Sequence, residues 1–197
     1  MVDTSVPHRR AIMINKTVET YPSFPLPDGF VISGYKAGLE RAWAEIEVEQ
    51  QGLEYEKALE VFGKEFLSCP ELIGERCLFV IEEKTGEVAA VASLWRGEIA
   101  PGIPMNRIHW VATRAKFQGL GLSKSLLSYI MDLYHTLGEC GGIYLTTQTE
   151  SYVAINIYKK FGFTPYMGEL HGEDFDRNSH KEAWEIINGK INEYKKR

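Results

Sequence analysis

A strand, a glycine loop, a helix and a second strand follow one another directly between residues 107 and 148. The segment RIHWVAT has the β-branched and aromatic composition of a strand, and Gly119 and Gly121 come after it. Leucine and isoleucine then recur at helical spacing from Leu122 to Leu137, and Gly138 ends the pattern. The strand-like segment GIYLTTQ comes next. Such a succession predicts helices that cover a sheet.

The rest of the chain extends this alternation in both directions. Upstream, FVISGYK, CLFVIEE and EVAAVASLW are predicted strands, and the last two form a hairpin. Two helices, with apolar faces that begin at Leu39 and Tyr55, separate the first strand from the hairpin. Downstream, AINIYKKF predicts a short helix and FTPY a brief strand. The predicted order is β-α-α-β-β-β-α-β-α-β, and the fold class is α/β, a mixed central sheet with helices on both faces.

Proline and glycine mark the expected connections and the domain boundary. YPSFPLPDG, residues 21–29, contains three prolines and a glycine. We therefore expect residues 1–28 to be an N-terminal arm with an extended lead-in, and residues 29–197 to be one domain. Residues 68–74 and 97–106 are expected to be loops. The apolar spacing of HKEAWEIINGKINEYKK predicts a closing helix near residues 180–195.

Composition restricts the partners and the compartment. The net charge is −5 and no basic cluster interrupts the body, which argues against a nucleic-acid partner and favours cationic ones. Cys69, Cys77 and Cys140 lack the spacing of a metal site or a disulfide framework, so we expect free thiols, a reducing compartment and no metal. No apolar run approaches the ~20 residues of a membrane span, and the first residues do not form a secretory signal. A cytoplasmic protein without membrane partners is expected.

The glycine loop AKFQGLGLSK, residues 115–124, has two interpretations. A helix N-terminus presents unpaired N–H groups and partial positive charge, and glycine lets a phosphate approach the backbone closely. The pattern is not G-x-G-x-x-G and no G-K-[ST] follows, so the dinucleotide-binding and P-loop motifs are excluded. A tight turn from strand to helix explains the glycines equally well.

Two segments together resemble the GNAT N-acetyltransferase superfamily. VATRAKFQGLGLSKSLL is similar to the acyl-CoA-binding motif of that family, a strand followed by Q/R-x-x-G-x-G/A and a helix. AINIYKKFGF, residues 154–163, is similar to the family segment A-x-x-[LIF]-Y-x-x-x-G-F. The order and separation of the two motifs also agree, and the resemblance spans residues 30–166. It implies a GNAT-like fold, acetyl-CoA as co-substrate and a primary amine as acceptor.

The resemblance also implies roles for individual residues. The pyrophosphate would lie on the backbone N–H groups of the glycine loop, and the pantetheine arm would pair with Val111 and Thr113. The backbone N–H of Val111 or Ala112 would polarise the thioester carbonyl. The implied cofactor-binding residues are Val111, Ala112, Thr113, Gln118, Gly119, Leu120, Gly121, Leu122, Ser123 and Ser151.

Tyr158 occupies the position of the general acid of the family. Acyl transfer from a thioester releases a thiolate with a reference pKa of ~8.5, and a phenol of pKa ~10 can protonate it. Tyr158 lies on the apolar stripe of its predicted helix, so it faces inward. A core tyrosine that packs beside Phe161 is the alternative.

His109 is the candidate base or water anchor, because an acceptor ammonium of pKa ~10.4 must lose a proton. By strand alternation His109 shares a face with Val111 and Thr113. A polar residue that pairs within the sheet is an equal alternative. Glu82 and Glu98 are weaker candidates, the latter in a loop where solvation explains it.

The predicted function is therefore transfer of an acetyl group from acetyl-CoA to an amine by direct attack in a ternary complex. No cysteine is placed for a covalent relay. A module that binds acyl-CoA without turnover, or an enzyme for a longer acyl group, are the alternatives. The acceptor and the formation of a homodimer stay open.

HGEDFD, residues 171–176, lacks the spacing of a calcium loop and is expected to be a solvated connection.

Overall fold

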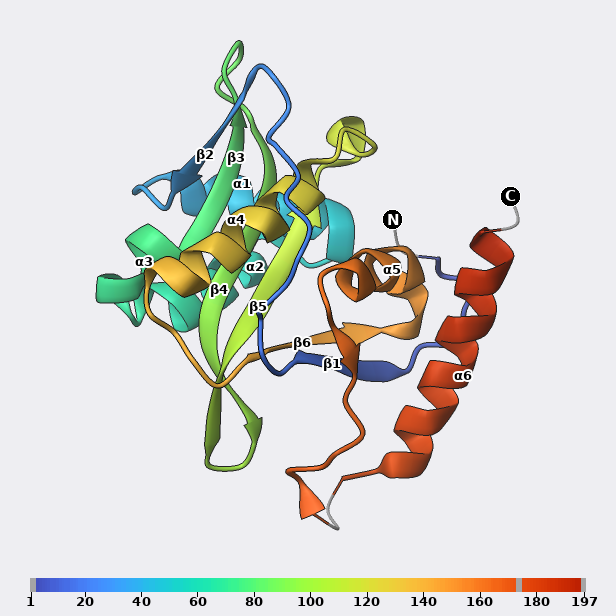
Figure 1. Ribbon diagram of the computed structural model, residues 1–197. Helices are drawn as coiled ribbons and strands as arrows, with labels where there is room; N and C mark the ends of the chain where they lie inside the picture. Colours follow the sequence, from blue (N-terminus) through green and yellow to red (C-terminus); the bar gives the residue numbers. More distant parts are fainter. Residues whose placement is uncertain (1–2, 173–174, 196–197) are drawn as a thin grey trace. The chain divides into compact units, whose positions relative to one another are not determined.

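The computed structural model describes residues 3–172 and 175–195 and divides into two compact units (Figure 1). We call Met1–Pro22, Arg96–Arg107 and Gly138–Arg197 the terminal unit, and Ser23–Trp95 and Ile108–Leu137 the central unit.

Seven strands pair in the order β2-β3-β4-β5-β6-β1-β7, and β4 and β5 contribute residues to both units. The pair of β5 and β6 is parallel, whereas β1 is antiparallel to both β6 and β7. The predicted α/β class with a mixed sheet is thus confirmed. The strands are β1 (Arg10–Asn15), β2 (Phe30–Gly34), β3 (Cys77–Glu82), β4 (Val88–Ala100), β5 (Ile103–Thr113), β6 (Ile143–Gln148) and β7 (Thr164–Pro165).

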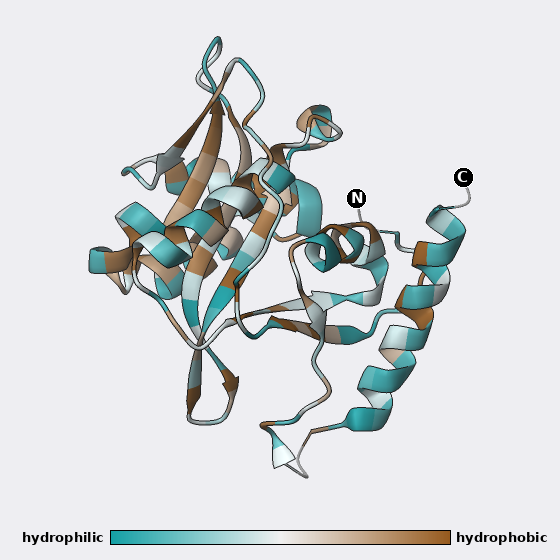
Figure 2. Cartoon of the chain, viewed as in Figure 1, coloured by the Kyte–Doolittle hydropathy of each residue, from teal (hydrophilic) through white to brown (hydrophobic). Residues whose placement is uncertain are grey.

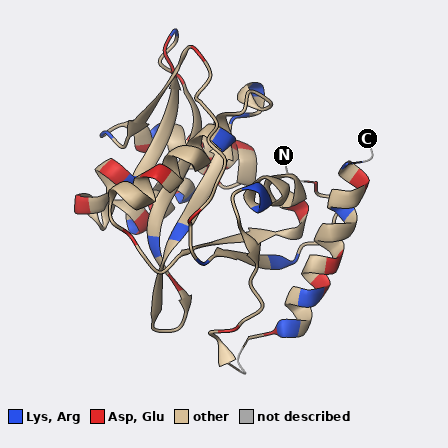
Figure 3. Ribbon diagram, viewed as in Figure 1, with Lys and Arg blue, Asp and Glu red and all other residues tan. Residues whose placement is uncertain are grey.

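Helices connect and cover the strands. The α-helices are α1 (Leu39–Gln51), α2 (Tyr55–Phe62), α3 (Pro70–Arg76), α4 (Leu122–Thr136), α5 (Tyr152–Lys160) and α6 (Arg177–Tyr194). Shorter helical turns in the described part of the chain include the π-helix η1 (Gly63–Leu67) and the 3₁₀ turns η2 (Ala115–Phe117) and η3 (Thr149–Ser151). Charged residues are found mainly on helices and connections (Figure 3), whereas hydrophobic residues are concentrated on the strands (Figure 2).

In the central unit, helices cover both faces of the strands. Trp43 of α1, Phe62 of α2 and Phe79 of β3 belong to one buried cluster, so α1 and α2 pack on the face to which Phe79 points. Leu78 and Val80 alternate with Phe79 and point to the opposite face. The apolar side of α4 packs against β3 there (Figure 1).

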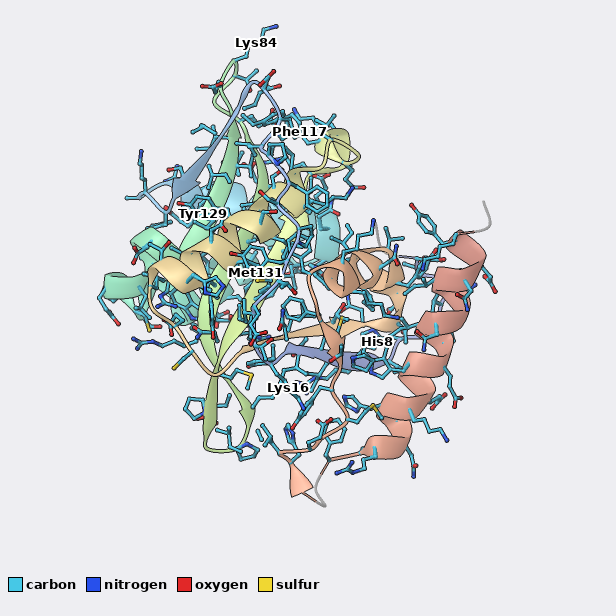
Figure 4. The ribbon with its side chains drawn as sticks, viewed as in Figure 1. His8, Lys16, Lys84, Phe117, Tyr129 and Met131 are labelled. Atoms are coloured by element: carbon cyan, nitrogen blue, oxygen red, sulfur yellow. The ribbon has the colours of Figure 1, made fainter. Side chains whose placement is uncertain are left out.

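In the terminal unit, the first strand of the chain lies between two later ones. β1 pairs with β6 on one edge and with β7 on the other. His8, labelled in Figure 4, lies just before β1. Its Nδ1 is 2.9 Å from Glu150 Oε1, and the Asn15 side-chain amide donates to the Phe161 carbonyl at 2.9 Å. Residues 10–15, predicted as part of an arm, therefore form an internal strand. α6 occupies the segment for which a closing helix was expected, and it contacts β1.

Two predicted loops are wrong. Residues 70–76 form α3, because Pro70 at the first helical position has the φ that a helix needs and loses no intrahelical hydrogen bond. Residues 97–106 belong mostly to β4 and β5, which a tight turn at Pro101 and Gly102 connects. Gly102 has φ of 72°, a conformation that glycine adopts without strain.

One buried carboxyl group opposes the folding of the central unit. Glu47 of α1 is fully buried, and within the described part of the chain neither of its carboxylate oxygens has a hydrogen-bond partner. Burial raises the pKa of Glu47 to about 8, because the charged form loses its hydration. The folded chain therefore keeps a proton on Glu47 at neutral pH.

We expect the free energy of unfolding to fall as pH rises from 5 to 8. An unfolded glutamate has a pKa of ~4.3, so in this window the folded state binds the extra proton and stability decreases by roughly 3 kcal/mol. Glu47→Gln has no ionisable group at this position, so its free energy of unfolding should not show this pH dependence. The free energy of unfolding of the variant minus that of the wild type should therefore increase by roughly 3 kcal/mol from pH 5 to pH 8. Urea unfolding at pH 5 and pH 8 measures the effect. Glu56→Gln, on the exposed side of α2, is the control, and equal pH dependence of wild type and Glu47→Gln would contradict the prediction.

Candidate active site

β5 contains a residue in an unusual backbone conformation immediately before the predicted cofactor strand. Trp110 has φ of 50°, in the left-handed region that a bulky residue rarely adopts. Its indole Nε1 donates a hydrogen bond to Glu65 Oε2 at 3.0 Å, and its ring lies 5.1 Å from that of Trp43. These contacts hold a conformation that costs on the order of 1–3 kcal/mol. Strain of this kind occurs preferentially at functional sites.

His109 and Glu65 form a contact beside this distortion. The Nε2 atom of His109 lies within hydrogen-bond distance of Glu65 Oε2, the oxygen that also accepts from Trp110. The His109 side chain is 10% exposed and that of Glu65 is 38% exposed, so the pair reaches solvent through the carboxylate. The His109 carbonyl accepts from Ser93 Oγ at 2.9 Å, which ties this point of β5 to β4.

The distortion at Trp110 interrupts the alternation of side chains along β5. His109 and Trp110 are consecutive, yet both side chains contact Glu65 and so lie on the same side. In a regular strand they would point to opposite faces. The prediction that His109 shares a face with Val111 and Thr113 assumes regular alternation along β5. That assumption is wrong, because the strand is distorted at Trp110.

The glycine loop is open on the side of its backbone. Gly119 and Gly121 have φ of 85° and 88°, and a Cβ built on either one would meet no atom within 4 Å. Gly121 is the N-cap of α4, and its carbonyl accepts from the N–H groups of Lys124 and Ser125. The N–H groups of Leu122 and Ser123, in the first turn, have no partner within the helix. An anion can therefore approach the backbone there.

Side chains from α1 hold the turn before the glycine loop. Glu49 Oε1 accepts from the Ala115 N–H at 2.5 Å, and Glu45 Oε2 lies 2.5 Å from Arg114 Nη2. The Gln118 amide donates to Gln50 Oε1 at 3.1 Å. Three side chains of α1 thus hold residues 114–118, the segment that leads into the glycine loop.

Several predicted cofactor residues lie together in the central unit. Thr113 Oγ1 and Ser123 Oγ are 2.9 Å apart, and the Gln118 amide donates to the Thr113 carbonyl at 3.2 Å. These bonds connect the end of β5 with the start of α4. The Gln118 N–H itself donates to the Ala115 carbonyl, so the open backbone begins at Gly119. Ala112 and Leu122 are buried, and Leu120 is exposed.

Tyr158 and Ser151 belong to the terminal unit. Tyr158 is 8% exposed on α5 and its ring lies 6.2 Å from that of Phe163 in an edge-to-face arrangement. Burial raises the pKa of Tyr158 to about 12, so the phenol keeps its proton at physiological pH. Ser151 is the N-cap of α5 and its side chain makes no capping bond.

The two weaker candidates have other surroundings. Glu82 accepts a hydrogen bond from Thr85 Oγ1 at 2.6 Å within the β3–β4 turn, which is a structural role. Glu98 lies in strand β4, not in a loop, and lines a cavity in the terminal unit.

Comparison with known proteins assigns a family to this arrangement. Residues 39–163 match the model of the acetyltransferase (GNAT) family, which is more than half of the chain. The chain belongs to the GNAT acetyltransferase family. The matched residues include β5, the glycine loop and α5. A search of curated protein sequences gives no match.

Solved GNAT structures share the fold at low sequence identity. A GCN5-related N-acetyltransferase from Sphaerobacter thermophilus superposes with a TM-score of 0.63 at 22% identity, over 82% of this chain and 49% of that one. A GNAT acetyltransferase from Colwellia psychrerythraea gives 0.61 at 12% identity, over 83% and 55%. A tandem GNAT protein from the clavulanic acid biosynthesis pathway gives 0.59 at 13% identity, over 84% and 52%. The chain thus spans about half the length of these structures.

Among residues 3–172 and 175–195, no helix combines the length and the apolar character needed to cross a bilayer. In the same ranges, no three His, Cys, Asp or Glu side chains are grouped so that they could hold one metal ion.

Glu65 is the residue of this site that the sequence pattern missed. The apolar spacing of Tyr55, Leu59, Phe62 and Phe66 predicts a helix face that leaves Glu65 beside it without a role. The π-helical turn η1 adds a residue at this point, and such turns often occur at functional sites. Glu65 can therefore be recognised as a site residue from the backbone conformation of η1, and not from the spacing of apolar residues.

We expect Glu65→Gln to move the titration of His109 to lower pH. A neighbouring carboxylate stabilises imidazolium, and the amide keeps the shape but loses the charge. An NMR titration of the histidine ring protons in the free protein should show the His109 midpoint at a lower pH. Glu60→Gln, one helical turn away on the exposed surface of α2, is the matched control. An unchanged His109 midpoint in Glu65→Gln would show that the contact does not stabilise the charged ring.

Proposed function

We propose that this GNAT chain is an N-acetyltransferase that moves an acetyl group from acetyl-CoA to a primary amine by direct attack in a ternary complex. The observation that carries the proposal is the open backbone at Gly119 and Gly121, at the N-terminus of α4 and directly after the distorted strand β5.

The glycine loop fits the pyrophosphate of acetyl-CoA. Space beside both glycines allows oxygen atoms to reach the backbone, and the first turn of α4 supplies N–H donors and the positive end of a helix dipole. The pairing of β5 with β6 covers Asn106 and Arg107 among the described residues, so the segment from Val111 to Thr113 lies outside it. Its backbone groups can therefore serve the pantetheine arm, in the way the family resemblance implies.

His109 is the proposed base. As a neutral imidazole, His109 takes a proton from the acceptor amine directly or through water, while its Nε2 contacts the Glu65 carboxylate. Glu65 then stabilises the imidazolium that forms, because its carboxylate lies against the ring. In this assignment Glu65 is a positioning residue.

Tyr158 is the proposed acid. The amine nitrogen forms a bond to the acetyl carbon, the carbon–sulfur bond breaks, and the sulfur leaves as thiolate. The phenol of Tyr158 donates its proton to that sulfur and recovers one from solvent. A raised phenol pKa keeps the donor protonated before the step.

A binding module for acyl-CoA and an enzyme for a longer acyl group remain as alternatives. A panel of primary amines, followed by release of free CoA thiol, decides between enzyme and module, because a module releases no thiol above the rate without amine. Acetyl-, butyryl- and octanoyl-CoA at equal concentration then compare the acyl groups by kcat/KM.

We expect Gly121→Ala to weaken acetyl-CoA binding by tenfold or more, about 1.4 kcal/mol, because the new methyl group fills the space beside the backbone. The control is Gly138→Ala. Gly138 also has a positive φ, and its Cβ would also meet no atom within 4 Å, so both variants lose ~1–2 kcal/mol of stability. Calorimetric titration with acetyl-CoA measures the difference. Equal affinities of the two variants would leave the loop as a tight turn only.

We expect Tyr158→Phe to lower the rate of the chemical step by about 10²- to 10⁴-fold, with little change in acetyl-CoA affinity. The ring is kept, so its edge-to-face packing with Phe163 survives. Single-turnover rates are required, because slow product release can hide the effect in kcat. A folded variant with the wild-type single-turnover rate would assign Tyr158 to the core and the acid to another residue.

A further inference from the structure

A small cavity lies within the terminal unit, in a region to which the proposed reaction gives no role. Its volume is about 280 Å³, and β1, the end of β4, the start of β6 and the segment that leads into α6 line it. Ile12, Ile99 and Phe175 supply apolar lining and belong to one buried cluster. A cavity of this size holds one small molecule.

Polar groups of both charges line the same cavity. They come from segments far apart in the sequence: Arg10, Glu98, Tyr144, His171, Asp176 and His180. Most of the residues that line the cavity are therefore polar, which suits a small charged ligand better than an apolar one.

His180 has an unsatisfied hydrogen-bonding atom. The side chain is 8% exposed, and its Nδ1 lies 3.1 Å from the Asp176 carbonyl oxygen. A carbonyl only accepts, so Nδ1 carries the proton of the neutral ring and Nε2 carries the lone pair. This Nε2 is buried and has no hydrogen-bond partner among the described residues. Burial lowers the pKa of His180, which keeps the ring neutral and Nε2 an acceptor.

Among the described residues, each of the two carboxylates accepts a backbone hydrogen bond through one of its oxygens. Glu98 Oε2 accepts from the Gly102 N–H at 3.2 Å, and Asp176 Oδ1 accepts from the Ser179 N–H at 3.0 Å. These bonds fix both side chains at the cavity and leave a second oxygen on each for a donor. A ligand that carries N–H groups and positive charge matches two carboxylates and an imidazole lone pair.

Aromatic rings reinforce this preference. The rings of Phe175 and His180 are 4.1 Å apart, and those of His171 and Phe175 are 5.1 Å apart. The Tyr144 ring lines the cavity as well. Aromatic faces attract an ammonium group, most strongly where water is excluded.

Arg10 favours a ligand that also carries a negative charge. It is exposed in β1 and lines the same cavity. A guanidinium binds a carboxylate through two parallel hydrogen bonds. A ligand with an ammonium group alone would meet repulsion from Arg10, whereas one that also carries a carboxylate would satisfy it.

We propose that this cavity binds a small zwitterion of the amino-acid class, with its ammonium group toward Glu98, Asp176 and His180 and its carboxylate on Arg10. The proposal does not depend on acetyl transfer. The same chemistry describes either an acceptor of the acetyl group or an effector that is never acetylated.

The test first measures thermal stabilisation of the full chain by the twenty standard L-amino acids. Calorimetric titration then compares L-norleucine with pentylamine, which lacks the carboxylate, and hexanoate, which lacks the amine. The zwitterionic probe should bind about tenfold more tightly than either partial analogue, because each lacks one charge-assisted contact.

Two variants and a control assign the contacts. His180→Phe keeps an aromatic ring but removes the acceptor atom, and should raise the Kd of the zwitterion about tenfold. Arg10→Met should raise that Kd similarly and leave the Kd of pentylamine unchanged or lower. His135→Phe, at an exposed histidine in the central unit, should change neither. Melting curves of each variant verify folding.

Two results would overturn the proposal: no stabilisation or heat from any amino acid at millimolar concentration, or zwitterion binding that His180→Phe and Arg10→Met leave intact. Mass spectrometry after addition of acetyl-CoA distinguishes the two sources of the ligand. An N-acetylated product marks an acceptor, and binding without acetylation marks an effector. Failure of the zwitterion to bind would leave acetyl transfer to other amines untouched.

Discussion

The left-handed backbone of Trp110 is the constraint on which the geometry of the central unit depends. A tryptophan in this conformation persists only where its surroundings fix it. Here the indole N–H is bound by Glu65 and the ring packs edge-on against Trp43. One carboxylate therefore holds both the distorted residue and His109.

The segment that follows Trp110 is also held at its other end, by hydrogen bonds and ion pairs to α1 and β4. These contacts help to offset the free-energy cost of the distortion. Arg114, at the end of β5, is bound by Glu45 and donates from Nε to the Val88 carbonyl at 2.9 Å. Glu49 holds the next N–H along the chain. With both ends of the segment 110–115 held in this way, a ligand at the proposed glycine-loop site would have less ordering entropy to supply.

The sequence predicted what depends on neighbouring residues. The hairpin of β3 and β4, the helix α4 and its glycine N-terminus follow from local spacing, and the family motifs located Tyr158 and the loop. The position of β1 could not be read in this way, because its partners in β6 lie more than a hundred residues away and the prolines of residues 21–29 separate it from the body. Glu65 was missed for a different reason. Its role depends on a π-turn and a strand distortion, and neither has a spacing signature.

The two proposed ligand regions also differ in where their residues come from. The family match covers residues 39–163, which includes the glycine loop, His109 and Tyr158. In the cavity of the terminal unit, Glu98 and Tyr144 fall inside that range, but Arg10 precedes it and His171, Asp176 and His180 follow it. The groups assigned to the shared acyl-CoA chemistry thus lie in the part that defines the family, whereas most polar groups of the cavity lie in its flanks. Exchange of the flanking segments alone can therefore change the ligand of the cavity while the glycine loop and its supports stay as they are.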